Sequence, residues 1–88
     1  MSAPTEPADA LADEPRPTDV APGLYEHYKG HRYEVLDLAR HSETEDWFVV
    51  YRALYGEHGV WMRPLDMFAE QVRVDGVDLP RFRRLGPA

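Results

Sequence analysis

Histidines are the side chains of this sequence that most readily suggest chemistry, because four of them occur in 88 residues. They are His27, His31, His41 and His58. The first pair is four residues apart, which would place both imidazoles on one face of a helix. However, the pair spans Lys29-Gly30, which is typical of a turn, and the chain has neither cysteine nor an HExxH pattern. We therefore expect no metal site and no cofactor, and histidines that are exposed or form structural hydrogen bonds.

The run His41-Ser42-Glu43 contains the residue types of a nucleophile triad. Adjacent residues on an extended loop point in different directions, so they cannot relay a proton from one to the next. A domain this small also rarely encloses a pocket of the size that small-molecule sites need. The sequence therefore predicts a protein that is not an enzyme and has no catalytic residues. The least favoured alternative is an enzyme, or an enzyme subunit, with a site near Arg52 and His41.

Arg52 lies inside an apolar run, where a purely structural strand would have a neutral residue. A charge in that position needs a partner. A salt bridge with Glu34, Glu43 or another carboxylate is the favoured explanation, since acidic residues are abundant nearby. The alternative is that the guanidinium holds an anionic ligand in a bidentate fork.

Aromatic side chains give the strongest indication of a function. All ten lie between Gly23 and Phe82, and the centre of a small β domain cannot hold so many rings. Some rings should therefore lie at the surface near Arg52 or Arg63, where they could hold an extended peptide, a stacked base or a cationic group. The candidate ligand-binding residues are Tyr25, Tyr28, Arg52, Trp61 and Arg63. The alternative is that Trp61, Tyr51 and Phe68 are core residues and the other rings only line the surface.

Composition places the folded domain after residue 22. Residues 1–22 contain five prolines, no aromatic residue, and only Leu11 and Val20 as large aliphatic residues. Such a segment cannot offset the entropy cost of ordering its backbone, so we expect a disordered, acidic leader. It also lacks the basic start and apolar run of a signal peptide, and no stretch of the chain is apolar and long enough to span a membrane. We expect a domain at 23–84 and a tail at 85–88.

Charge is unevenly distributed along the chain. Five acidic residues and one arginine give residues 1–22 a charge of −4, so residues 23–88 carry only −2 of the total −6. This near balance disfavours general attraction to phosphate backbones, although Arg81, Arg83 and Arg84 form a local basic cluster. The absence of cysteine is consistent with the reducing cytoplasm, where we expect the protein to reside.

Short strands and tight turns must position these side chains. Alternation and β-branched residues predict strands at 23–28, 32–40, 47–55 and 60–63, with the third at the centre of the sheet. Inside the second strand the apolar phase changes between Val35 and Leu36, which indicates a bulge or sharp bend. Residues 65–68 predict a single helical turn. The pair Asp75-Gly76, between two β-branched runs, predicts a hairpin in which both residues have positive φ. Five or six short strands with one helical turn are typical of a small, bent, all-β barrel.

Several separated pieces of the chain, in order, resemble a bacterial family known as domain of unknown function 1653. The pieces are Tyr25-Glu26-His27-Tyr28-Lys29-Gly30, Tyr33-Glu34-Val35-Leu36, Ala39-Arg40-His41-Ser42-Glu43-Thr44, Val50-Tyr51-Arg52-Ala53-Leu54-Tyr55-Gly56, Trp61-Met62-Arg63-Pro64-Leu65, Met67-Phe68, Val74-Asp75-Gly76 and Pro80-Arg81-Phe82. The resemblance implies an SH3-like barrel from Gly23 to about Arg83. It implies no activity, since the family has no defined catalytic residues.

These observations favour a non-catalytic SH3-like binding module with an aromatic and arginine surface. We expect its partner to be a protein or peptide, with weak self-association through an open edge strand as a second possibility. We expect no association with membranes. The main alternative is a single-stranded nucleic-acid-binding protein, since small barrels often have that role.

Overall fold

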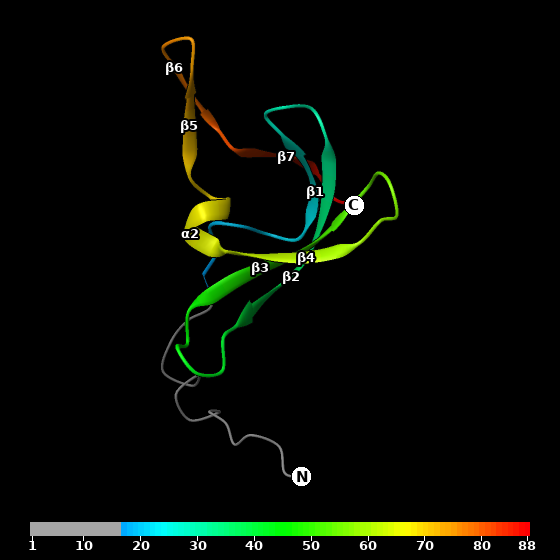
Figure 1. The fold of residues 1–88 in the computed structure, drawn as a ribbon, viewed down its shortest axis with the longest axis vertical. Coiled ribbons are helices and arrows are strands. Elements are labelled where there is room, and N and C mark those ends of the chain that lie inside the picture. The colour runs from blue at the N-terminus through cyan, green and yellow to red at the C-terminus, as the bar shows by residue number, and fades with distance from the viewer. Residues whose placement is uncertain (1–16) are drawn as a thin grey trace.

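The computed structural model describes residues 17–88, which form seven strands and one short helix (Figure 1). The elements are β1 (Gly23–His27), β2 (Arg32–Arg40), β3 (Trp47–Ala53), β4 (Val60–Pro64), α2 (Leu65–Phe68), β5 (Gln71–Val74), β6 (Val77–Pro80) and β7 (Phe82–Gly86). The predicted all-β class is confirmed. Residues 1–16, which contain most of the predicted leader, lie outside the described part of the chain.

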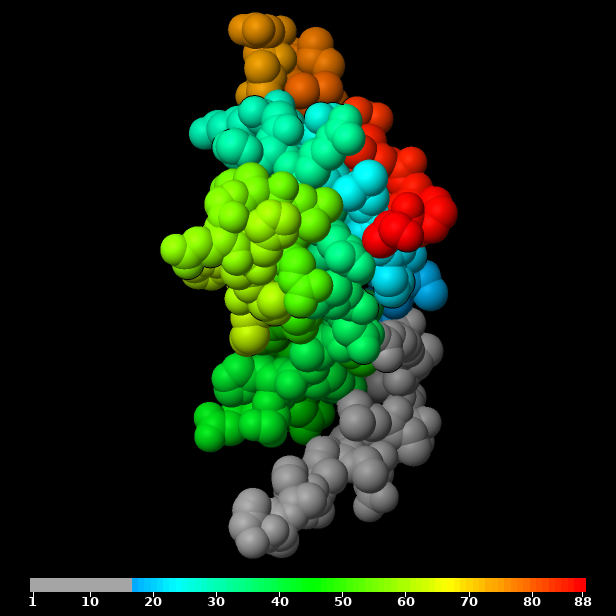
Figure 2. All heavy atoms as spheres, turned by 90° about the vertical axis from the view of Figure 1, so that its right-hand side faces the viewer, coloured from blue at the N-terminus to red at the C-terminus, as the bar shows by residue number. Residues whose placement is uncertain are grey.

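The strands form two antiparallel sheets that do not close into the predicted barrel. Five strands pair in the order β4-β3-β2-β1-β7, and β5 and β6 form a separate hairpin. In Figure 2 the yellow-green residues of β4 and the red C-terminal strand lie at opposite margins of the molecule, as this order requires. The sheet stays open because the β5–β6 hairpin rises away from it in Figure 1 instead of joining its two edges. The central strand is β2, whereas the sequence predicted the strand at 47–55.

A bulge in β2 explains the predicted change of phase. Val35 pairs with Tyr51 and Asp37 pairs with Val50, so the register shifts at Leu36. The extra residue returns Leu38 to the side of the sheet that carries Val35. Both side chains are therefore buried on one surface, which we call the inner face. The predicted hairpin turn is also confirmed, since Asp75 and Gly76 have φ values of 52° and 80°.

The core lies on the inner face, beneath α2. Val35, Val49 and Phe68 are the most completely buried large side chains of the described residues. The Phe68 ring stacks on Phe82 of β7 at 4.0 Å between ring centroids, with the ring planes almost parallel. The short helix α2 thus covers part of the sheet, because its Phe68 fills the centre of the aromatic cluster.

The segment before β1 also contributes to the core. Val20 is buried, and the Tyr25 hydroxyl accepts a hydrogen bond from the Ala21 N–H and donates one to its carbonyl oxygen. Arg84 donates a further hydrogen bond to the carbonyl oxygen of Pro22. Residues 17–22 are therefore held against the sheet, although their composition predicted a disordered leader. Within residues 17–88, no helix has the length and apolar character needed to cross a membrane.

Candidate functional site

The inner face continues beyond the core as an open surface. Four further side chains lie on this face: Tyr33, Ala53, Trp61 and Arg63. On β4, Arg63 is opposite the buried Val49 and Trp61 is opposite the buried Tyr51. Ala53 is two residues after Tyr51 on β3 and so has the same orientation, and Tyr33 is opposite Ala53. Beyond the part of the sheet that α2 covers, these side chains line a groove of about 370 Å³. We call it the aromatic groove; it is lined by Tyr33, Tyr51, Ala53, Tyr55, Gly56, Glu57, Gly59, Trp61 and Arg63.

One wall of the groove is formed by the rings of Tyr33 and Tyr55, which are held in place by each other and by a histidine outside the groove. The hydroxyls of Tyr33 and Tyr55 share a hydrogen bond of 2.8 Å, and the two rings pack edge to face. The His31 imidazole stacks on the Tyr55 ring at 4.3 Å between centroids. Burial, followed by the Tyr55 hydroxyl, raises the pKa of Tyr33 to about 12. The Tyr33 hydroxyl is therefore neutral near pH 7 and can act as a hydrogen-bond donor or acceptor.

Arg63 provides a positive charge at the border between the groove and the core. Its Nε donates a hydrogen bond to the Tyr51 hydroxyl, and its guanidinium carbon lies 5.8 Å from the centroid of the Phe82 ring. Among residues 17–88 it has no carboxylate partner, in contrast to Arg81, which pairs with Glu70, and Arg83, which pairs with Glu26. The Arg63 cation is thus positioned by aromatic groups and is not neutralised by an acid.

Trp61 forms the outer margin of the groove. It lies on β4 opposite Tyr51, yet 62% of its surface is exposed, because no element of residues 17–88 covers this part of the inner face. The indole lies against the backbone of Gly59: a Cβ at that glycine would be 3.3 Å from the indole nitrogen. Glu57 lines the groove from the β3–β4 connection and has no ion pair in the described part of the chain.

The structure brings together two of the five residues predicted from the sequence, Trp61 and Arg63. Tyr25 is in the core, with only 5% of its surface exposed, because its ring packs edge-on against Phe68. Tyr28 is exposed but lines a separate groove of about 400 Å³, where the Lys29 amine lies 5.8 Å from its ring centroid.

Arg52 is on the outer face of the sheet, opposite Glu34 on β2 and Val60 on β4. It forms no ion pair with Glu34 or with any other carboxylate among the described residues. The residue is half-buried, on the face of the sheet opposite to the aromatic groove. The alternative prediction placed Trp61, Tyr51 and Phe68 in the core. It is correct for Tyr51 and Phe68, which are buried, and wrong for Trp61, which is exposed.

Sequence reasoning missed Tyr33 and Tyr55 as specific groove residues. A signal was present for Tyr33, since it has the same strand phase as Val35, which marks the inner face. Tyr55 lies beyond the end of β3, in a connection where Gly56 and His58 have positive φ. Alternation along a strand does not predict the direction of such a side chain.

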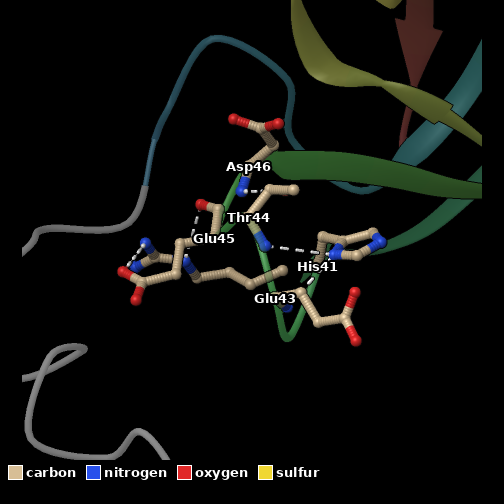
Figure 3. A network of polar contacts seen from close by, with 6 residues as sticks. His41, Glu43, Thr44, Glu45 and Asp46 are labelled. Atoms are coloured by element: carbon tan, nitrogen blue, oxygen red, sulfur yellow. Dashed lines mark hydrogen bonds and ion pairs between the residues drawn. The ribbon is translucent and has the colours of Figure 1, made fainter.

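The loop after β2 uses its histidine as a structural group (Figure 3). The Nδ1 atom of His41 accepts hydrogen bonds from the backbone N–H groups of Glu43 and Thr44, at 3.1 and 3.2 Å. The Asp46 N–H donates to the Thr44 hydroxyl, while the Asp46 carboxylate points away from this network in Figure 3. Ser42 takes no part in it. Within residues 17–88, no three histidine, aspartate or glutamate side chains gather as the ligands of a metal ion would.

A family model described as protein of unknown function (DUF1653) matches residues 23–84. The chain is also similar to a protein of DUF1653 from Bordetella bronchiseptica, known from its crystal structure. That protein is 40% identical, with a TM-score of 0.72, and the match covers 80% of this chain and 92% of the other. No curated protein matches the sequence.

Proposed function

This chain belongs to the DUF1653 family of proteins of unknown function, and from that premise we propose that it is a non-catalytic binding module. Its aromatic groove holds a segment of a partner protein. The observation that carries the proposal is the exposure of Trp61 and Tyr55 beside Arg63, on the same face that elsewhere forms the dry core. Exposed aromatic residues and arginine are the residue types that most often dominate binding energies at protein interfaces.

The rigidity of the groove supports a role in binding. Tyr55 is fixed by its hydrogen bond to Tyr33 and by stacking on His31, so the wall is formed before any ligand arrives. Arg63 is held in the same way by the Tyr51 hydroxyl. A preformed site loses little conformational entropy on binding, which increases affinity for a given contact area.

Support for a non-catalytic role comes from the use of the histidines. The Nδ1 atoms of His27 and His41 accept hydrogen bonds from backbone N–H groups of their own loops. These nitrogen atoms are therefore not free to act as general bases. The groove itself contains no serine, cysteine or histidine that would serve as a nucleophile or base.

The pairing of basic residues favours a protein partner over single-stranded nucleic acid. Arg32 and Arg83 pair with Glu26, Arg73 pairs with Asp78, and Arg81 pairs with Glu70. Each of these acids lowers the local positive charge that phosphate groups would require. Aromatic rings beside Arg63 would still accommodate a stacked base, so an oligonucleotide is a necessary arm of the test.

The test is selection of a phage-displayed random peptide library on the full chain, with counter-selection on a double variant, Trp61→Ala with Arg63→Ala. Selected peptides are then synthesised and titrated by calorimetry, beside a single-stranded dT oligonucleotide. We expect peptides with micromolar affinity that bind either single variant at least about tenfold more weakly.

The matched control is Val77→Ala. Val77 also has 57% of its surface exposed, but it lies on β6, in the hairpin that does not line the groove. It should leave groove binding nearly unchanged. Failure to enrich any peptide against the double variant would refute the proposal, and binding of dT that depends on Trp61 would replace it with the nucleic-acid alternative.

A further inference from the structure

Strand β4 is an open edge of the five-stranded sheet. Only β3 pairs with it within the described residues. The Ala53 N–H donates to the Gly59 carbonyl oxygen, so these two residues form a hydrogen-bonded antiparallel pair just before β4. Hydrogen-bonded pairs alternate along an antiparallel ladder. The polar backbone groups of Trp61 and Arg63 therefore point toward β3, and those of Val60 and Met62 point outward to the open edge.

The first three residues of this edge lack the features that normally protect an exposed strand, and Arg63 and Pro64 follow them only at its end. Val60, Trp61 and Met62 are consecutive apolar residues with 51%, 62% and 57% of their surfaces exposed. No charged residue interrupts them, and the proline of this strand, Pro64, stands only at its end. Native proteins usually place lysine, proline or a bulge at such an edge, because free backbone groups there pair with other chains.

The edge and the aromatic groove are adjacent, since Trp61 belongs to both. In a strand added beside β4, residues opposite Trp61 and Arg63 would share the inner face with them. Residues opposite Val60 and Met62 would lie on the outer face, against two exposed apolar side chains. The alternation of β4 thus imposes an alternating pattern on any strand that pairs with it.

We propose that the groove ligand is an extended segment that adds to β4 as an antiparallel sixth strand and places an acidic side chain opposite Arg63. Its next inward residue, opposite Trp61, is aromatic or aliphatic, and its outward residues, opposite Met62 and Val60, are apolar. This inference rests on the proposed function and specifies its ligand. Such strand addition draws affinity from backbone hydrogen bonds and specificity from alternate side chains.

The charge preference follows from the position of each ionisable group. Arg63 has no carboxylate partner in the described residues, so a bound acid would supply the missing counter-ion. The acid of the groove, Glu57, comes from the β3–β4 connection, at the opposite end of β4 from Arg63. An acidic residue is therefore favoured at the Arg63 end and disfavoured near the connection.

A second copy of the chain is a poorer occupant of the edge. Its own β4 would place only Trp61 or Arg63 opposite Arg63 on the inner face, and so would supply no acid there. The ligand must carry an acidic residue at this position, and β4 contains none.

The experiment uses the acetylated and amidated peptide Ser-Val-Glu-Val-Tyr-Val-Ser and the full chain, with affinity measured by calorimetry. In antiparallel pairing, Glu lies opposite Arg63 and Tyr opposite Trp61, and the two valines that follow them lie opposite Met62 and Val60. N-methylation of those two valines removes the N–H groups that pair with β4, and should weaken binding at least about tenfold. N-methylation of Glu and Tyr removes N–H groups that point away, and should change affinity less than about threefold.

Two further comparisons test the charge preference. Replacing the peptide Glu by Gln should weaken binding to the natural chain but not to Arg63→Gln, while Trp61→Ala should weaken the binding of both peptides. Equal effects of the two N-methylated peptides, or a Gln peptide that binds as well as the Glu peptide, would overturn the inference.

If none of these peptides binds while selected library peptides still depend on Trp61, strand addition is wrong and the proposed function stands. Sedimentation that shows a dimer lost in Met62→Asp, with no peptide binding, would assign the edge to a second copy.

Discussion

The two halves of the inner face are made of similar residues and differ in what covers them. In the closed half, Val35 and Val49 are covered by Phe68 of α2 and by the segment that contains Val20. In the open half, Trp61 and Tyr55 have 62% and 43% of their surfaces exposed. The β5–β6 hairpin does not cover them: it rises away from the sheet in Figure 1, and none of its residues lines the groove.

Because of this difference, one half of the inner face stabilises the fold and the other half is left available for binding. Complete burial gives the closed half most of its stabilising free energy, since apolar groups stabilise in proportion to the area removed from water. The open half retains apolar area that folding does not use, together with the unneutralised cation of Arg63. Substitutions in one half should therefore change the free energy of unfolding, and substitutions in the other should change affinity.

Phe68→Ala should produce the largest effect on stability. The ring stacks on Phe82 and packs on Tyr25 and Tyr51 at 5.5 Å between centroids, so its removal leaves a cavity at the centre of the core. We expect a loss of about 3–5 kcal/mol in the free energy of unfolding, measured by urea denaturation followed by circular dichroism. If that variant does not fold, Phe68→Leu retains most of the volume and should cost less than about 1.5 kcal/mol. A loss below about 1 kcal/mol for the alanine variant would show that α2 does not close this half.

Tyr25→Phe should have an intermediate effect, at the cover of the closed half. It removes the hydroxyl that accepts from the Ala21 N–H and donates to its carbonyl oxygen. The expected cost is about 1 kcal/mol, with faster hydrogen exchange at the Ala21 amide as the segment around Val20 loosens. Tyr28→Phe is the matched control, because the Tyr28 hydroxyl has no hydrogen bond among the described residues. Unchanged exchange at Ala21 would mean that Val20 alone holds the segment.

Trp61→Ala should have almost no effect on stability, in contrast to the loss of Phe68. Its ring is mostly in water already, so the free energy of unfolding should change by no more than about 0.5 kcal/mol while binding is lost. Urea denaturation and calorimetry on the same preparation measure both quantities. A destabilisation as large as that of Phe68→Ala would refute the division of the inner face into two halves.

Much of the fold could be predicted from the sequence, because its determinants are local. The phase change at Leu36 and the pair Asp75-Gly76 each depend on a few neighbouring residues. Strand β7 was missed because Arg83 and Arg84 hide its alternation, and its pairing with β1 joins residues far apart in the chain. The same limit applies to the position of β2 at the centre of the sheet.

The site could be predicted only in part, for a related reason. Trp61 and Arg63 share a strand phase, and the surplus of rings implied that some would be exposed. Alternation shows which face a side chain takes but not whether another element covers that face. Tyr25 therefore appeared equivalent to Trp61, although the first is beneath α2 and the second is in water.

A pH titration should give a smaller change in the free energy of unfolding, through His27, whose imidazole packs edge-on against Phe82 of the core. Burial of the imidazole, and then the charges of Arg81, Arg63, Lys29 and His31, lower the pKa of His27 below its ordinary 6.5. As the pH falls below 6.5, His27 in the unfolded chain therefore takes up a proton before His27 in the folded chain does. Stability from this group is fully present above pH 6.5 and declines as the pH falls below it. Urea denaturation between pH 8 and pH 5 should show this decline, and His27→Gln should reduce it. An identical pH dependence in the variant would exclude His27 as its source.

The smallest effect concerns the wall of the open half, and tests whether the groove is preformed. Tyr55→Phe removes the hydroxyl that, after burial, does most to raise the pKa of Tyr33 to about 12. We expect the pKa of Tyr33 to fall in the variant but to stay above its ordinary 10.0, because burial remains. Ultraviolet titration of tyrosinate measures the change, and Tyr28→Phe is the control, since Tyr28 is not bonded to Tyr33.

The raised pKa of Tyr33 also affects stability, because the folded chain holds the Tyr33 proton more tightly than the unfolded chain does. The natural chain therefore loses stability as the pH rises above 10, and the variant should lose less stability over that range. An unchanged pKa would mean that the hydroxyl pair does not persist in solution, and the open half would then be an adaptable surface instead of a fixed groove.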